Sequence, residues 1–140
     1  MIQLVYVSSA TKEMNEDDLI FLLGQCRSRN EKQDVTGMLL YVDGNYIQAL
    51  EGDEKDVDEI YSDIVKDYRN TGNILMIKSE ISERAFSGWS MGFKHLSDTN
   101  KGKIEGYTDF LNKKMTPGEI ANSSSLAVKL LYSFKTTNPS

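Results

Sequence analysis

The segment TGMLLYVDGNYIQALEG, residues 36–52, decides the fold. Asp43-Gly44 separates two apolar runs, and this arrangement is among the strongest short signals for a β-hairpin. We therefore predict two antiparallel strands, from Gly37 to Val42 and from Asn45 to Glu51.

Gln48 is an amide in the middle of the second of these strands. Its own face also carries Tyr46 and Leu50, and the opposite face is apolar too, so we expect both faces to be covered and Gln48 to be buried. A buried amide without hydrogen-bond partners costs about 1–3 kcal/mol. Tyr6 on the first strand is a candidate partner. Two interpretations stay open: a structural bond to Tyr6 and a backbone carbonyl, or a polar ligand between the helices.

The elements on either side of the hairpin give the order β-α-β-β-α-β, with one extra strand. We expect a first strand over Ile2 to Ser8, a helix capped by Asn15 and ending near Asn30, a second helix capped by Asp53, a strand over residues 73–82 and a short strand from Ser90 to Phe93. This order is the ferredoxin-like pattern, an α+β fold in which two helices cover one face of the sheet. The first and third strands should be central and adjacent.

Apolar stripes predict which faces of the helices are buried. In the first helix the stripe consists of Leu19, Leu22, Leu23 and Cys26. In the second helix it consists of Val57, Ile60, Tyr61, Ile64, Val65 and Tyr68.

Residues 96–140 are more polar than the rest of the chain and include a Pro-Gly turn. We expect a short helix and then a second helix from about Ser123 to Phe134, which would pack on the sheet face that the main helices leave bare. The predicted organisation is one domain over residues 1–95 and a helical extension over residues 96–140, without an output domain.

Composition argues against several classes of function. The net charge of −5 and the pI of about 4.9 disfavour partners such as nucleic acid or an anionic membrane surface. No apolar stretch approaches the roughly 20 residues of a spanning helix, and MIQLVYV reads as a strand rather than a signal peptide, so a cytoplasmic location is expected. One cysteine and one histidine argue against a Cys/His metal site.

One set of residues lies along residues 2–95 in a distinctive order and spacing: Tyr6, Asn30, Thr36, Gly37, Gln48, Leu50, Glu51, Gly52, Asp67, Arg69, Trp89 and Met91. Its specific part is Q-A-L-E-G after a Thr-Gly strand, followed by W-S-M. This pattern resembles that of the BLUF domain, a family of blue-light sensors that use flavin.

The resemblance implies a bound flavin, FAD or alternatively FMN, with its ring between the two helices. Asn30 would bond the polar edge of the ring, and Gln48 would lie between Tyr6 and the N5/C4 edge. The phosphate tail would extend towards solvent. The implied flavin contacts are Tyr6, Leu22, Arg29, Asn30, Gln48, Ile64, Asp67, Arg69, Asn70 and Met91. Cys26 is either inert core or part of the flavin pocket.

The resemblance also implies a photochemical mechanism. The excited flavin would take an electron and a proton from Tyr6, with Gln48 as the relay, and the amide would then rearrange by rotation or tautomerisation. Ser8, Trp89 and Met91 would transmit the change, through a last strand that bears Trp89 and Met91 and leads into the C-terminal helices.

Two positions depart from the family pattern. Asn70 stands where many relatives have His, and Arg29 stands where they often have Asn or His, which affects the finer ring contacts and spectral tuning. The implied protein is a photoreceptor rather than an enzyme, and it would signal to a downstream protein or within a homo-oligomer. The rival hypotheses are a light-independent flavin reductase and a flavin-free interaction module.

Overall fold

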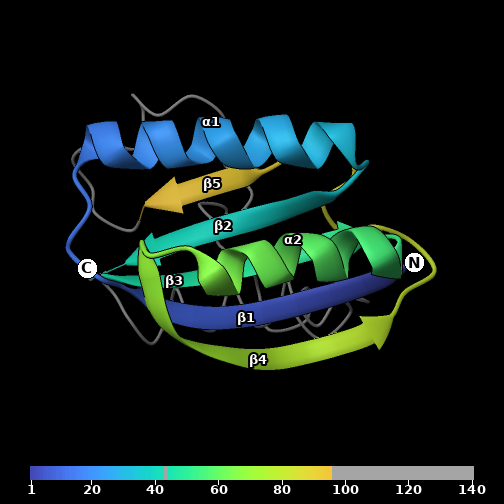
Figure 1. Ribbon diagram of the computed structural model, residues 1–140. Helices are drawn as coiled ribbons and strands as arrows, with labels where there is room; N and C mark the ends of the chain where they lie inside the picture. The colour runs from blue at the N-terminus through green and yellow to red at the C-terminus, as the bar shows by residue number, and fades with distance from the viewer. Residues whose placement is uncertain (43, 96–140) are drawn as a thin grey trace, which may run out of the picture.

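Five strands form one sheet in the order β4-β1-β3-β2-β5, and both helices lie across the same face of it (Figure 1). This computed structural model describes residues 1–42 and 44–95. Its elements are β1 (Ile2–Ala10), α1 (Glu16–Lys32), β2 (Thr36–Val42), β3 (Asn45–Gly52), α2 (Glu54–Lys66), β4 (Asn70–Glu80) and β5 (Gly92–His95). The predicted ferredoxin-like α+β order is confirmed, and the extra strand β5 pairs in parallel with β2 at the edge.

The central strands bring Tyr6 and Gln48 together. β1 and β3 are antiparallel neighbours, and Tyr6 lies directly opposite Gln48. On the other side of β3, Leu39 of β2 lies opposite Gln48. Val42 pairs with Asn45 at the end of the predicted hairpin, where Gly44 has φ +79°.

Both faces of the sheet bury apolar side chains, as the pattern of β3 predicts. Tyr46 and Leu50 belong to the core under the helices, whereas Ile47 and Ala49 belong to a second core on the opposite face. Phe86, from the connection between β4 and β5, packs into this second core. The predicted helix from Ser123 to Phe134, and the whole predicted extension over residues 96–140, lie outside the described residues.

The first helix begins where its cap predicts. Asn15 Oδ1 accepts from the backbone N–H of Asp18 at 2.9 Å, and Asp18 Oδ2 accepts from that of Asn15 at 3.2 Å, which forms a capping box. The helix continues two residues past Asn30, to Lys32. Asp53 occupies the cap position of α2 but makes no side-chain capping bond there.

The predicted stripe of the second helix was wrong at its end. Val65 is 47% exposed and Tyr68 is 84% exposed. The helix stops at Lys66 because Asp67 adopts an extended conformation, with φ −75° and ψ 125°, so Tyr68 does not continue the helical period.

The last two strands are displaced from their predicted positions. β4 begins at Asn70 rather than at residue 73, because β1 extends to Ala10 and pairs with it there. β5 begins at Gly92 rather than at Ser90, so Trp89 and Met91 precede the strand instead of lying on it. A turn precedes β5. In this turn Gly88 has φ +84°, and the N–H of Trp89 donates to the carbonyl of Phe86.

Candidate functional site

Tyr6 and Gln48 form a hydrogen-bonded pair in the interior. The hydroxyl of Tyr6 donates to Gln48 Oε1 at 2.6 Å, and Gln48 Nε2 lies 3.5 Å from the sulfur of Met91. Both side chains are buried. A thioether is a weak acceptor, so the amide has a strong partner on its oxygen and a weak one on its nitrogen.

Burial controls the acid–base state of Tyr6. Loss of hydration raises the pKa of Tyr6 well above its usual 10.0, and the neighbouring Cys26 adds to the shift. The phenol therefore holds its proton across the physiological range. The ring of Tyr61 on α2 lies 5.2 Å from that of Tyr6, centroid to centroid.

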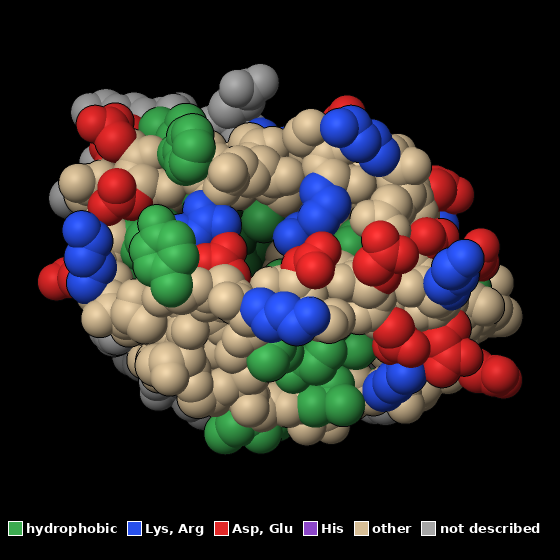
Figure 2. All heavy atoms as spheres, in the orientation of Figure 1, with side chains coloured by type: hydrophobic (Ala, Val, Ile, Leu, Met, Phe, Trp, Pro, Cys, Tyr) green, Lys and Arg blue, Asp and Glu red, His purple; other side chains and the backbone are tan. Residues whose placement is uncertain are grey.

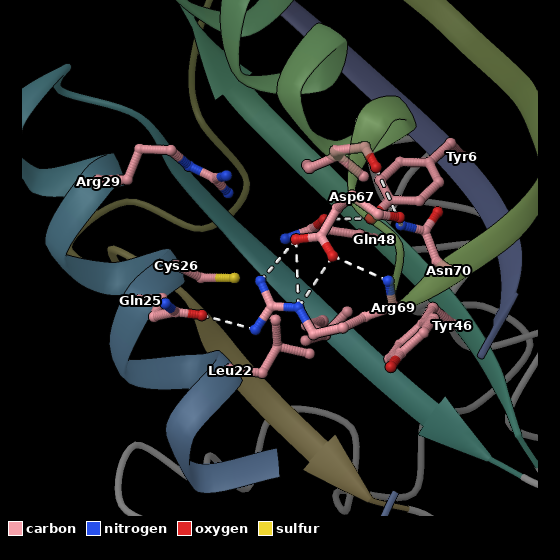
Figure 3. Close-up of a pocket in the computed structure, with 12 residues that line it drawn as sticks. Tyr6, Leu22, Gln25, Cys26, Arg29, Tyr46, Gln48, Asp67, Arg69 and Asn70 are labelled. Carbon is pink, nitrogen blue, oxygen red and sulfur yellow. Dashed lines mark hydrogen bonds and ion pairs between the residues drawn. The ribbon is translucent and has the colours of Figure 1, made fainter. Parts of the chain in front are cut away.

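A cavity opens beside this pair, between α1 and α2 (Figure 3). It contains about 460 Å³ of empty space, measured to its opening, which is within the usual range of ligand pockets. In Figure 2 it is a hollow between the two helices, with acidic and basic side chains at its rim. Its lining residues are Tyr6, Leu22, Gln25, Cys26, Arg29, Leu39, Tyr46, Gln48, Ile64, Asp67, Arg69 and Asn70.

The lining suits a flat ligand with polar edges. Leu22 on α1 and Ile64 on α2 supply apolar walls from the two helices. Arg29 Nε and Nη2 and the hydroxyl of Tyr46 are buried, yet none of them has a hydrogen-bond partner among the described residues. Buried donors without partners are costly, so a ligand with carbonyl or ring-nitrogen acceptors would satisfy them.

Asp67 and Arg69 form an ion pair at the rim. Arg69 Nη2 lies 2.6 Å from Asp67 Oδ2, and this bond lowers the pKa of the Asp67 carboxyl. Arg69 Nη1 also donates to Gln25 Oε1 at 2.6 Å, so its guanidinium reaches from the start of β4 to α1 (Figure 3). Asn70 lies beside them and donates to the carbonyl of Ile64 at 2.9 Å, which closes the end of α2.

Two residues of the predicted flavin site do not line this cavity. Asn30 is fully buried and donates to the carbonyl of Ser90 at 2.7 Å, and its Oδ1 has no partner among the described residues. Met91 lies in the core under the helices and contacts the amide of Gln48. The ring contact of Asn30 stays a prediction.

The residues predicted to transmit the signal lie on different faces of the sheet. Ser8 is buried on the face of Tyr6, and its hydroxyl has no partner among the described residues. Trp89 packs against the opposite core, with its ring centroid 6.0 Å from that of Phe86. The carbonyl of Trp89 accepts from the backbone N–H of Gly37 at 3.0 Å. Met91 is therefore on the side of Gln48, and Trp89 is on the far side.

Glu51 anchors the connection that carries Trp89. Its carboxylate is fully buried and accepts from Gln3 Nε2 at 3.0 Å and from Thr36 Oγ1 at 3.2 Å. It also accepts from the backbone N–H groups of Ala85 at 2.7 Å and Phe86 at 3.0 Å. One side chain thus ties β1 and β2 to the β4–β5 connection.

Sequence reasoning did not include Gln25, Leu39 and Tyr46 in the site, although all three line the cavity. Tyr46 could have been found, because strand alternation places it on the face of Gln48. Leu39 could have been found from the hairpin register. Gln25 gave no signal, since an exposed glutamine on a helix is ordinary. Cys26, for which two interpretations were open, lines the cavity.

Comparison with known proteins identifies the family. Residues 1–92 match the model of the BLUF family, described as sensors of blue-light using FAD. This chain belongs to the BLUF family. It is a sensor that binds a flavin, and the matched residues are those of a sensor domain rather than of a catalytic one. The rival hypotheses of a flavin reductase and of a flavin-free module are not favoured.

Curated relatives and solved structures agree with this assignment. The chain is 35% identical over 89 residues to the beta subunit of photoactivated adenylate cyclase from Euglena longa, which covers 63% of this chain and 10% of the relative. The alpha subunit from Euglena gracilis is 35% identical over 86 residues, and this match covers 61% of this chain and 8% of that subunit. The chain thus spans about a tenth of the length of these relatives.

The similar solved structures include BlsA and BlrP1. The photo-activated state of BlsA has a TM-score of 0.66 and 29% identity, covering 94% of this chain and 91% of that one. BlrP1 of Klebsiella pneumoniae with FMN and cyclic diGMP has a TM-score of 0.63 and 27% identity. This match covers 68% of the present chain and 26% of the BlrP1 chain.

No helix in residues 1–42 and 44–95 is long and apolar enough to cross a membrane. Within the same residues, no group of three or more His, Cys, Asp or Glu side chains could hold a metal ion.

Proposed function

We propose that Tyr6 and Gln48 form the light-driven switch of this BLUF domain. The observation that carries the proposal is the 2.6 Å hydrogen bond from the Tyr6 hydroxyl to Gln48 Oε1, at the wall of a cavity between the helices. When bound, the flavin supplies blue-light absorption and a strongly oxidising excited state. Tyr6 gives up an electron, and its acidified hydroxyl releases its proton towards Gln48 Oε1. The electron goes to the excited flavin, and both electron and proton return to Tyr6 by charge recombination. The Gln48 amide stays rearranged, beside a flavin that is oxidised again, until it relaxes in the dark.

Gln48 is suited to rearrange because its two ends are held unequally. Its oxygen accepts a short bond from Tyr6, whereas its nitrogen faces only the sulfur of Met91 at 3.5 Å. When Tyr6 loses its proton, its hydrogen bond to Gln48 Oε1 changes. The weak contact between Gln48 Nε2 and the sulfur of Met91 then does little to prevent rotation of the amide. The amide then turns or tautomerises, and its N–H groups acquire a new direction towards the cavity.

The flavin ring would lie between Leu22 and Ile64, and the unpaired donors of Arg29 and Tyr46 would bond its acceptors. Asp67, Arg69 and Asn70 would hold the ribityl side at the rim. Asn30 would contribute a ring contact through its unpaired Oδ1. We assign FAD as the flavin on the family description, whereas FMN is the flavin named for BlrP1.

Met91 would convey the rearrangement from Gln48 to the edge of the sheet. It contacts the Gln48 amide and directly precedes β5. Ser8 and Trp89 would respond on either side of the sheet. The output would be an altered contact with a downstream protein in the cytoplasm, or with a second copy of the chain.

The test is the absorption spectrum of the flavin-loaded protein before blue light, after it and through recovery in darkness. We expect a small red shift without bleaching that reverses in the dark. Bleaching, or a spectrum that light leaves unmoved, would contradict the switch.

Two variants of pocket tyrosines locate the donor. Tyr6→Phe should keep flavin bound and abolish the red shift, because it removes the hydroxyl that bonds Gln48. Tyr46→Phe removes a hydroxyl proposed to bond the flavin, so it should weaken flavin binding; it should still retain the red shift, because Tyr46 makes no hydrogen bond to Gln48. Gln48→Leu should also bind flavin and lose the shift. A normal red shift in Tyr6→Phe would refute the donor assignment.

A further inference from the structure

A second hollow continues from the rim of the flavin cavity. It shares Arg69 with that cavity and is otherwise lined by Thr11, Lys12, Met14, Asp18, Phe21 and Tyr68. It holds about 920 Å³ of empty space up to its opening. We refer to it as the Arg69 groove. In Figure 2, hydrophobic side chains lie among acidic and basic ones at this end of the face.

Two aromatic side chains on this groove are unusually exposed. Phe21, on α1, is 66% exposed, and Tyr68, just after α2, is 84% exposed. Neither belongs to the two apolar cores of the described residues. They come from different elements, α1 and the segment after α2, and both line the groove. Exposed aromatic faces are the surfaces on which nucleobases stack.

The charges of the groove suit a diphosphate beside a polar heterocycle. Lys12 makes no ion pair with a described residue, and Arg69 retains three donors beyond those that Asp67 takes, one of which bonds Gln25. Asp18 is the acidic member, and its Oδ2 already accepts from the backbone of Asn15. Its remaining oxygen is an acceptor for an amine or a sugar hydroxyl.

The loop of the groove is fixed by hydrogen bonds. Thr11 Oγ1 donates to the carbonyl of Tyr68 at 2.9 Å, and Thr11 N–H donates to that of Arg69 at 3.1 Å. Met14 N–H donates to the hydroxyl of Tyr41 at 3.0 Å. The backbone of the groove is therefore held in place before a ligand binds, which lowers this part of the ordering cost of binding.

We infer that the Arg69 groove binds the adenosine diphosphate part of FAD. The diphosphate lies near Lys12 and Arg69, and the adenine stacks on Phe21 and Tyr68. This inference rests on the proposed placement of the ring in the adjoining cavity, and it replaces the expectation that the phosphate tail ends in solvent. It makes the domain selective for FAD over FMN and riboflavin.

The experiment measures dissociation constants for riboflavin, FMN and FAD by quenching of flavin fluorescence. In the wild type we expect FAD to bind more tightly than FMN. Phe21→Ala and Tyr68→Ala should each raise the dissociation constant of FAD by about fivefold, which is the low end for loss of base stacking. Both should leave the dissociation constant of riboflavin unchanged. Val65→Ala is the control, because Val65 is exposed and apolar but does not line the groove. It should leave all three constants unchanged.

Charge and competition give two further readouts. Lys12→Ala should weaken the binding of FAD more at low salt than at high salt. The control is Lys55→Ala, at an exposed lysine on α2, which should leave FAD binding unchanged at both salt concentrations. ADP alone should compete with FAD and leave riboflavin binding unaffected.

The outcomes separate the groove from the cavity. Equal affinities of the wild type for FAD and FMN, or aromatic variants that weaken all three flavins alike, would overturn the groove assignment while the ring site stands. Failure of the wild type to bind riboflavin would overturn the ring placement, and the groove assignment with it.

Discussion

Gln48 lies between a strong hydrogen-bond donor and a weak acceptor. Most buried amides in proteins have their polar atoms satisfied by firm partners, which fixes their orientation. Here the oxygen receives the Tyr6 hydroxyl, and the nitrogen has only a sulfur at 3.5 Å. The side chain is thus buried and ordered, yet its orientation depends on a single proton.

Gly37, in the family motif, is needed because strands β2 and β3 approach closely. A Cβ at this position would collide with the backbone carbonyl of Ala49 and press on the methyl group of Met91. Gly37→Ala should therefore lower the free energy of unfolding by several kcal/mol, measured by urea denaturation.

Gly24→Ala is the matched control for that substitution. Gly24 lies in α1 with nothing within 4 Å of its added methyl group. Alanine is the better helix former by about 0.5–1 kcal/mol, so this variant should be slightly more stable. Equal effects of the two substitutions would contradict the steric argument.

The buried phenol of Tyr6 makes stability depend on alkaline pH. Its pKa is raised above 10.0 in the fold, so the unfolded chain releases this proton first as the pH rises. Stability is therefore full below pH 10 and falls above it, by at most about 1.4 kcal/mol per pH unit for each such group. Urea unfolding between pH 9 and 11 should show a shallower loss in Tyr6→Phe than in the wild type. Identical slopes would argue against the shift.

At the scale of elements, the β4–β5 connection depends on one carboxylate. Glu51 binds two backbone N–H groups of the connection and two side chains of the central strands. Arg84 reinforces it, because Nη1 donates to Thr36 Oγ1 at 2.9 Å and Nη2 donates to the carbonyl of Asp34 at 2.8 Å. Trp89 and Met91 thus lie on a segment that is firmly held at its beginning.

Glu51→Gln tests this anchor. The amide would set an NH₂ group against other donors, so we expect a loss of roughly 1–3 kcal/mol in stability. Trp89 is the only tryptophan of the chain, so its fluorescence in the flavin-free protein should shift to the red as the connection loosens. Glu83→Gln, at an exposed position of the same connection, is the control. Unchanged emission in Glu51→Gln would show that the connection does not need the carboxylate.

The sequence predicted element order better than element ends. Local signals, such as the Asn15 cap and Asp43-Gly44, act over a few residues and placed α1 and the hairpin correctly. The ends of β4 and β5 depend on pairing with β1 and β2, which are distant along the chain, so no local pattern marked them. Tyr68 continues the apolar pattern of α2 in the sequence, but the chain leaves the helix at Asp67, and the apolar pattern carries no sign of this turn.

The site was predictable where chemistry fixes the residue type. Tyr6 and Gln48 follow from strand alternation and central pairing, and the structure joins them by a hydrogen bond. The link from Arg69 to Gln25 was not predictable, because it depends on the distance between α1 and the segment that joins α2 to β4. The same holds for the Arg69 groove, because Phe21 and Tyr68 are ordinary surface residues in the sequence and only the fold brings them to one groove.

On the scale of the whole molecule, flavin binding should stabilise the fold. The cavity is shared by α1, α2 and the central strands, so a ligand there binds only the folded chain. Riboflavin at about 100 times its dissociation constant should raise the free energy of unfolding by about 2.7 kcal/mol, measured by denaturation with and without ligand. Gln48→Leu should keep this gain, because apolar walls remain. No gain in the wild type would contradict binding in the cavity.

The central position of β1 has a consequence for how the protein is made. The first strand of the domain lies inside the sheet, between β4 and β3, and its partners are residues 45–52 and 70–80. Tyr6 and Gln48 are separated by 42 positions along the chain, so their bond closes a long loop. Topologies dominated by such distant pairings fold slowly. The sheet around the light-sensing pair is therefore incomplete until β4, at residues 70–80, has been synthesised, and sensing begins only when most of the domain has been translated.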